Sequence, residues 1–217
     1  MTEVDVALTD YLLAVESALF AFLLSQRASD RAPSGRGGWR DPFALFFAAT
    51  GAGSLIGGTV HGFFLAGDSL AGVVLWRAAL LAVGVAALCG WAIGARMLFG
   101  EATARAIRIA ACVEFLAYAA VVLCVNDSFW VAVANYLPTT AFLIVAFAAV
   151  YRATGHRAAA IGAAGLASTI AAAAIQQFRV AVHPRYFNHN ALYHVVQAAA
   201  LFMIFWSARA PAMQRPR

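Results

Sequence analysis

Histidine and carboxylate side chains inside apolar segments are the groups in this sequence best suited to chemistry. His61, His194 and Asp10 fall within long apolar stretches, and His189 stands at the start of one. Ionisable side chains are costly at membrane depth, so those found there are candidates for a functional site. Converging imidazoles bind Zn²⁺ and leave a fourth position for water. The bound water then loses a proton near neutral pH, and a nearby carboxylate can act as general base.

The elements that position these groups are predicted to be membrane-spanning helices. The chain is 63% hydrophobic and only 12% charged, whereas a soluble domain is about a quarter charged. A bilayer core of roughly 30 Å requires about 20 apolar residues per helix. Seven segments meet this requirement: 6–26, 43–66, 70–97, 103–125, 128–151, 157–177 and 189–208. The sequence therefore predicts an all-α integral membrane protein, a single seven-helix transmembrane bundle over residues 1–217.

The arginines predict the orientation of this bundle. All fifteen basic residues are arginines, and most of them flank alternate connections and the C-terminus. By the positive-inside rule, the N-terminus lies outside and the C-terminus is cytoplasmic. Residues 26–42 form a flexible cytoplasmic loop and residues 209–217 a cytoplasmic tail. We expect the plasma (inner) membrane of a bacterium, with membrane lipids as partners and no nucleic acid, since the net charge of +5 follows from topology.

With this topology, several polar residues fall at one depth near the outer face. They are Asp10, His61, Asp68, Asp127, His189 and His194. Positions 189 and 194 are about 140° apart around an ideal helix, so they share a face only if His189 precedes the first turn. Asn188 is a suitable N-cap for that arrangement. The alternatives are a helix-packing role for His61, a solvent-facing His189, and turn roles for Asp68 and Asp127. Asp10 is the best carboxylate for a site.

Three further features concern packing and deeper charges. Arg77 and Glu114 lie on adjacent antiparallel segments, where they would form a structural ion pair or serve a function. Gly53 and Gly57 make a small-residue pair that favours close helix packing. Pro138 predicts a kink beside a cavity, although proline is also common in membrane helices without function.

The stretch Phe187-Asn-His189-Asn-Ala-Leu-Tyr-His194-Val-Val-Gln resembles the last-helix signature of the CREST superfamily. That group includes the alkaline ceramidases and the progestin and adipoQ receptors. Its members are seven-helix proteins in which a histidine on helix 2 and an H-x-x-x-H pair on helix 7 bind zinc. A serine and an aspartate complete a site that hydrolyses amide bonds in lipids. The resemblance implies His61, His189 and His194 as zinc ligands, although His189 precedes His194 by five residues.

The same resemblance implies the remaining site residues. Gly57 stands where the serine is expected, and Ser54 lies on nearly the same helical face as His61. Asp68 is the nearest match to the aspartate. The predicted catalytic residues are therefore Asp10, Ser54 and Asp68.

We therefore hypothesise a zinc-dependent membrane hydrolase acting on an amide-type lipid near the outer leaflet. Two alternatives remain open. Two histidines on facing helices can ligate haem in a redox module, and a metal-free bundle can be a small-molecule transporter or receptor. The lack of lysine excludes a retinal Schiff base. No glycine-rich motif follows a strand, which argues against a dinucleotide-binding or P-loop enzyme.

Overall fold

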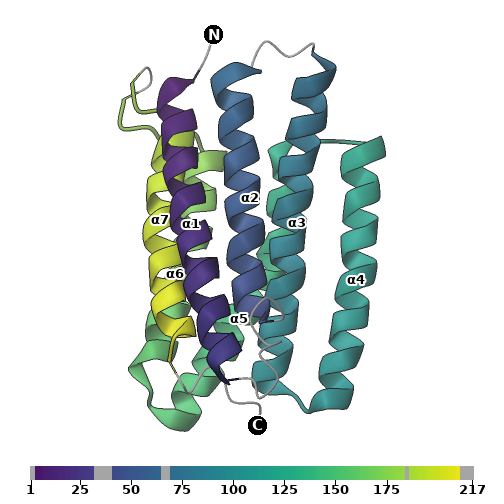
Figure 1. The fold of residues 1–217 in the computed structure, drawn as a ribbon, viewed down its shortest axis with the longest axis vertical. Helices are drawn as coiled ribbons and strands as arrows, with labels where there is room; N and C mark the ends of the chain where they lie inside the picture. The colour runs from purple at the N-terminus through teal and green to yellow at the C-terminus, as the bar shows by residue number, and fades with distance from the viewer. Residues whose placement is uncertain (1–2, 32–40, 65–68, 184–185, 211–217) are drawn as a thin grey trace.

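The computed structural model describes residues 3–31, 41–64, 69–183 and 186–210, and these form seven α-helices. The helices are α1 (Val4–Arg31), α2 (Pro42–Phe63), α3 (Leu70–Leu98), α4 (Glu101–Cys124), α5 (Phe129–Thr154), α6 (Arg157–Gln177) and α7 (His189–Ala208). Successive helices run in opposite directions, so the start of α1 and the end of α7 lie at opposite ends of the bundle, which we call its N-terminal and C-terminal ends (Figure 1). Each helix is long and apolar enough to cross a membrane.

The predicted spans agree with these helices, with one correction at the first connection. The spans 157–177 and 189–208 coincide with α6 and α7, and α1 continues beyond residue 26 to Arg31. Glutamine, arginine and alanine are good helix formers, so the start of the predicted 26–42 loop extends the helix. Residues 32–40 of that loop and 211–217 of the predicted tail lie outside the described residues.

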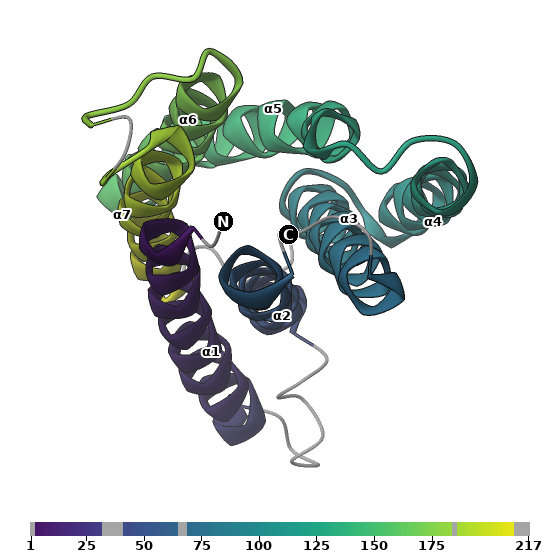
Figure 2. The ribbon, with the colours of Figure 1, turned by 90° about the horizontal axis from the view of Figure 1, so that it is seen from above.

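Six of the helices form a ring, and α4 stands outside it. Viewed along the bundle, α1, α2, α3, α5, α6 and α7 follow one another around the ring, and α7 returns to α1 (Figure 2). Helix α5 packs on α3 and α6, while α4 packs mainly on α3. Only 17% of the most apolar stretch of α4 is buried, against 39–50% for the ring helices. A functional site inside the bundle therefore depends on the ring.

Glycines allow the ring helices to approach closely. A Cβ atom added at Gly58 would lie 3.2 Å from the Ala7 carbonyl oxygen of α1. One added at Gly165 would lie 2.8 Å from the Ala200 carbonyl oxygen of α7. The predicted pair of Gly53 and Gly57 does not form one contact surface, because Gly53 faces α3 and Gly57 faces α1.

The two ends of the ring differ in how they are filled. Near the C-terminal end, aromatic and aliphatic side chains form the main apolar core, in which Phe20 stacks on Phe205 with ring centroids 4.1 Å apart. The outward surface is also apolar and includes Leu12, Val15, Ile109, Val113, Leu116, Val145 and Trp206. An apolar exterior around an apolar core is the arrangement expected of a helix bundle in lipid. The buried ionisable side chains inside the ring, Asp10 and His194, lie toward the other end.

Candidate functional site

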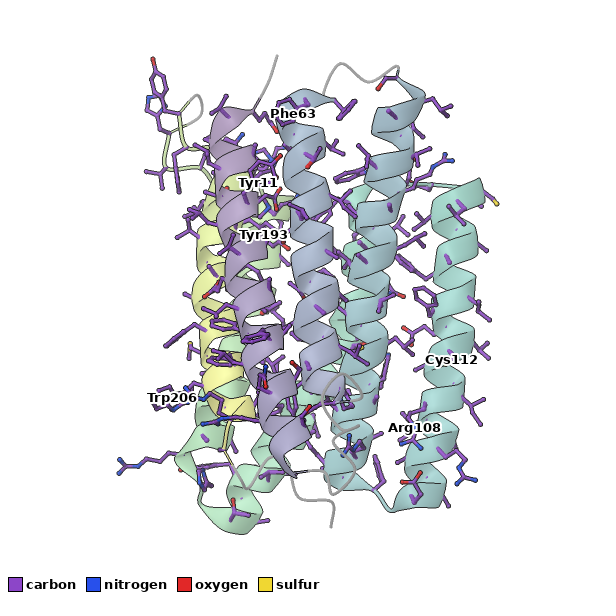
Figure 3. The ribbon with its side chains drawn as sticks, in the orientation of Figure 1. Tyr11, Phe63, Arg108, Cys112, Tyr193 and Trp206 are labelled. Carbon is purple, nitrogen blue, oxygen red and sulfur yellow. The ribbon has the colours of Figure 1, made fainter. Side chains whose placement is uncertain are left out.

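A cavity of about 140 Å³ lies inside the ring. We call it the axial cavity; residues from all six ring helices line it. Its polar lining residues are Asp10, Thr50, Ser54, Tyr136, Thr139, Thr140, Thr169, Tyr193, His194 and Gln197. Tyr193 lies in the half of the bundle that contains the N-terminus, as does Tyr11 of α1 (Figure 3). The side chains of this cavity are the candidate functional site.

A buried pair of Asp10 and His194 is the ionisable centre of the axial cavity. Asp10 Oδ1 lies 3.2 Å from His194 Nε2, and these side chains are only 6% and 9% exposed. Two adjacent glycines on α2 make room for the carboxylate. A Cβ atom at Gly58 would lie 2.9 Å from Asp10 Cβ, and one at Gly57 would lie 3.4 Å from Asp10 Oδ2. The position where the CREST resemblance expects a serine is therefore filled by the aspartate of α1.

The contacts of Thr9 indicate which nitrogen of His194 carries a proton. Its hydroxyl oxygen lies 3.0 Å from His194 Nδ1 and 2.9 Å from the backbone carbonyl oxygens of Asp5 and Val6. A hydroxyl has a single proton. We assign that proton to a carbonyl, as is common for helical threonine, so that the hydroxyl oxygen accepts from His194 Nδ1–H. Because His194 Nε2 lies 3.2 Å from Asp10 Oδ1, we place one further proton between these atoms, and the pair as a whole then carries no net charge.

A second histidine–carboxylate pair, His61 and Glu3, lies at the end of the bundle. His61 Nδ1 is 2.9 Å from Glu3 Oε2, and the side chains are 17% and 34% exposed. The backbone N–H of Glu3 donates to the His61 carbonyl over 3.2 Å, and Asn188 Nδ2 donates to Glu3 Oε1 over 3.3 Å. This pair ties the start of α1 to the end of α2 and the start of α7. Glu3 was not predicted, because it precedes the first apolar segment.

The three predicted histidine ligands do not assemble into one site. His61 and His194 are close enough to interact electrostatically, but each pairs with its own carboxylate. His189 is the first residue of α7, after the Asn188 N-cap, and it does not line the axial cavity. Because His189 is already helical, its angular separation from His194 keeps the two imidazoles apart.

The donor set consequently does not fit a three-histidine zinc site. Among residues 3–31, 41–64, 69–183 and 186–210, no three His, Cys, Asp or Glu side chains are grouped to hold a metal ion. Both ring nitrogens of His194 are already in contact with polar partners, Nδ1 with the Thr9 hydroxyl and Nε2 with Asp10 Oδ1. A zinc or haem iron would have to displace one of them.

The structure describes two of the three predicted catalytic residues. Asp10 and Ser54 both line the axial cavity. Asp68 lies outside the described residues. Tyr136 and Thr139 of α5 also line the cavity, and neither was predicted as a site residue. The signal available for them was Pro138, which falls between them in the sequence of α5.

Three polar atoms of the axial cavity are buried without a partner. Within the described part of the chain, Tyr136 Oη, Thr139 Oγ1 and Gln197 Oε1 have no hydrogen bond. Thr139 and Gln197 are 3% and 7% exposed, while Gln197 Nε2 donates to Thr169 Oγ1 over 3.4 Å. A buried polar atom without a partner costs free energy. Their position around one cavity indicates a place for water or for the polar group of a ligand.

The comparisons with known proteins give a family and no activity. The model of a "Family of unknown function (DUF6962)" matches residues 6–213. The chain belongs to this family. No curated protein and no solved structure matches it. The DUF6962 match covers nearly the whole chain, so the six-helix ring and its cavity lie within the family region.

In this DUF6962 chain Arg77 pairs with Asp127, so of the two roles predicted for Arg77 and Glu114, an ion pair or a functional role, the ion pair is wrong. Arg77 Nε donates to Asp127 Oδ2 over 3.0 Å, and Trp76 Nε1 donates to the Asp127 carbonyl over 2.6 Å. Arg77 is near the start of α3, level with the connection after α4, whereas Glu114 is about 15 Å deeper along α4. Neither Arg77 nor Asp127 lines the axial cavity, so this contact joins helix ends.

Proposed function

We propose that this protein is an intramembrane binding protein, a receptor or carrier that holds a small amphipathic molecule in the axial cavity. The observation that carries the proposal is the set of unpartnered polar atoms on Tyr136, Thr139 and Gln197 beside the buried Asp10–His194 pair. Clefts with mostly apolar walls and a few converging polar groups are the usual form of small-molecule sites. The Asp10–His194 pair would contact the polar group of the ligand.

The distribution of lining residues supports an amphipathic ligand. His194 and Gln197 lie within about two turns of the start of α7, whereas Ile204 is about four turns along it. Phe46 and Leu143 also lie deep along α2 and α5, measured from the end that carries Asp10. Apart from Thr50, the polar lining residues of the axial cavity therefore lie toward the N-terminal end of the bundle, and the deepest lining residues are apolar.

We propose in addition that the N-terminal end of the bundle faces outside. One end carries Arg27, Arg96, Arg105, Arg108, Arg152, Arg157 and Arg209, whereas Arg77 and Arg179 lie toward the other. Positive charges concentrate on the cytoplasmic side of membrane proteins. In this orientation the Asp10–His194 pair is in the outer half of the membrane. A bacterial plasma (inner) membrane stays a prediction.

Thermal unfolding of the purified protein in detergent tests ligand binding. The probes are n-hexanol, n-hexylamine and n-hexanoate, which share one apolar body and differ in the polar group. A ligand that binds only the folded state raises the unfolding midpoint. We expect at least one probe to do so for the wild-type protein.

A matched pair of alanine-to-leucine variants locates the effect. Ala87 lines the axial cavity, whereas Ala117 is exposed on α4. Ala87→Leu should fill the cavity and remove the stabilisation by the probe, and Ala117→Leu should keep it. The proposal fails if no probe stabilises the wild-type protein, or if Ala87→Leu responds as strongly as Ala117→Leu.

Hydrolysis of an amide-type lipid is the second candidate function. It is favoured by Ser54, which lines the same cavity as Asp10 and His194. A histidine–carboxylate pair can take a proton from water or from a serine hydroxyl. Vesicles containing an N-acyl lipid with a fluorescent acyl chain provide the assay. Turnover that is lost in both Ser54→Ala and His194→Ala would favour hydrolysis, and lack of turnover by the wild-type protein would reject it.

Elemental analysis of the same samples tests the zinc ligands implied by the CREST resemblance. We expect no stoichiometric zinc, because the three histidines do not converge. One zinc per chain that disappears in His194→Ala and in His61→Ala would restore the zinc hydrolase hypothesis.

A further inference from the structure

We infer that the ligand of the axial cavity is an amine that binds as its cation, and that its binding expels the proton shared by Asp10 and His194. This inference rests on the proposed binding function and adds the chemical class of the ligand and a coupled proton release. The charges around the cavity, the hydrogen-bonding groups that face it and the proton balance of the buried pair each support it.

The charges around the axial cavity disfavour an anionic ligand. The chain has fifteen arginines and no lysine, yet no arginine is among the residues that line the cavity. A carboxylate or phosphate would therefore enter a poorly solvated space with no fixed positive charge beside it. Burial of an unpaired charge is strongly unfavourable. Asp10, in contrast, can supply a negative charge to a cation.

The titratable neighbours of the Asp10–His194 pair do not change the balance of charge around the axial cavity. Tyr136 of α5 and Tyr193 of α7 line the same cavity, and both are neutral in their ordinary state near pH 7. His61 of α2 interacts electrostatically with His194 and is already paired with Glu3. The lining residues from α3 and α6 have no titratable side chains.

The free hydrogen-bonding groups match a donor-rich ligand. Gln197 Oε1 can only accept a hydrogen bond, and its amide nitrogen already donates to Thr169. The unpartnered hydroxyl oxygens of Tyr136 and Thr139 can also accept. A primary ammonium group has three N–H donors, whereas an alcohol has a single O–H donor. Tyr193, an aromatic residue that lines the cavity next to His194, adds a favourable contact for a cation.

The proton balance follows from the net charge of the site. Before binding, Asp10 and His194 share one proton and have no net charge. If an alkylammonium entered and this proton stayed, the buried site would carry a full positive charge. Release of the shared proton to bulk water leaves the ammonium beside the Asp10 carboxylate and a neutral His194 that keeps its Nδ1–H toward Thr9. One cation enters, one proton leaves, and no covalent bond of the ligand changes.

Proton release on addition of n-hexylamine is the decisive measurement. Purified protein in weakly buffered detergent solution at pH 7 receives n-hexylammonium chloride, and a pH-indicator dye records the protons. An alkylamine has a pKa near that of lysine, so it is already charged at this pH. We expect about one proton released per amine bound, and an apparent affinity that rises about tenfold per pH unit while the pair is protonated. Binding without proton release would overturn the inference.

Comparison with n-hexanol and n-hexanoate separates the ligand class from the proposed function. We expect the amine to bind at least about tenfold more tightly than either. Equal or tighter binding of the alcohol or the carboxylate would overturn the amine assignment and leave the binding function intact. If none of the three compounds binds, the proposed function fails and the amine assignment fails with it.

Two matched carboxylate-to-amide variants assign the proton to its site. Asp10→Asn should lower the affinity for n-hexylamine at least about tenfold and remove proton release. Glu3→Gln makes the same chemical change in the Glu3–His61 pair and should keep both the affinity and the proton release. If Asp10→Asn does not fold, the proton count of the wild-type protein and of Glu3→Gln still decides the question. Equal proton release by all three proteins would overturn the inference.

Discussion

The two histidine–carboxylate pairs of this protein have similar chemistry and different surroundings. The inner pair, Asp10 and His194, has side chains 6% and 9% exposed and faces the axial cavity. The outer pair, Glu3 and His61, has side chains 34% and 17% exposed. The outer pair also bonds to the backbone and to Asn188, which joins three helix ends.

This difference shows how depth and neighbours assign roles to similar groups. The outer carboxylate uses both oxygens on protein partners, so little of its hydrogen-bonding capacity remains for a ligand. The inner pair lies beside polar atoms that have no partner. We therefore interpret the outer pair as a structural connection and the inner pair as the binding group. The stability of variants can test this division.

The largest expected difference is between Asp10→Ala and Glu3→Ala. Asp10→Ala leaves His194 Nε2 buried without its partner and should lower the free energy of unfolding by about 3 kcal/mol. Glu3→Ala removes a partly exposed contact and should lower it by about 1 kcal/mol or less. Unfolding of each variant by increasing mole fraction of sodium dodecyl sulfate in mixed micelles measures the two losses.

The double variant Asp10→Ala/His194→Ala serves as the control. Removal of both partners leaves neither group unsatisfied, so its loss should be smaller than the sum of the two single losses. Losses that simply add, or a larger loss for Glu3→Ala than for Asp10→Ala, would contradict the assignment of the inner pair as the buried, coupled one.

Most of the fold could be predicted because each helix can be recognised from its own segment of sequence. A run of about 20 apolar residues has few structural options in a membrane, and α6 and α7 begin and end where the hydropathy does. The end of α1 was missed because its last residues are polar and still favour a helix. The exclusion of α4 from the ring is a property of packing between helices, on which the hydropathy of one segment carries no information.

The candidate site was only partly predictable for a similar reason. Asp10 and His194 stand out as ionisable residues in apolar segments, and the structure brings them together. His189 and His61 have the same residue type and a similar position, but neither joins the site. His189 lies on another face of α7 than His194, and His61 pairs with Glu3. Tyr136 and Gln197 line the axial cavity because the ring arrangement brings α5 and α7 around it. Residue type indicates a candidate, whereas partners depend on contacts between helices distant in sequence.

A glycine variant on α2 can disturb the inner pair without changing its residues. An alanine at Gly58 would place Cβ 2.9 Å from Asp10 Cβ and 3.2 Å from the Ala7 carbonyl oxygen. We expect Gly58→Ala to lower the free energy of unfolding by about 1–3 kcal/mol, because α1 must move away from α2. Thermal unfolding in detergent measures this loss, and the affinity for n-hexylamine should fall with it.

Gly62→Ala is the matched control on the same face of α2. Its new Cβ atom would meet only Ala7 Cβ, at an ordinary contact distance of 3.4 Å. Alanine has the higher helix propensity, so this variant should be unchanged or more stable by about 0.5–1 kcal/mol. Equal losses in the two variants would show that Gly58 is not required for the position of Asp10.

The smallest expected effect concerns Asn188, which links the outer pair to α7. Its side chain accepts from the backbone N–H groups of Asn190 and Ala191 and donates to Glu3. Asn188→Ala should lower the free energy of unfolding by about 1 kcal/mol through loss of the cap. Faster hydrogen exchange at the first amides of α7 reports this loss directly.

Ser69→Ala is the matched control, since Ser69 caps α3 by accepting from the Gly72 N–H over 3.1 Å and has no contact with the outer pair among those described. Both variants should keep the wild-type affinity for n-hexylamine, because neither changes the inner pair. A fall in affinity in Asn188→Ala alone would mean that the outer pair controls the binding group. The two pairs would then act as one coupled network, and the division between structural connection and binding group would be wrong.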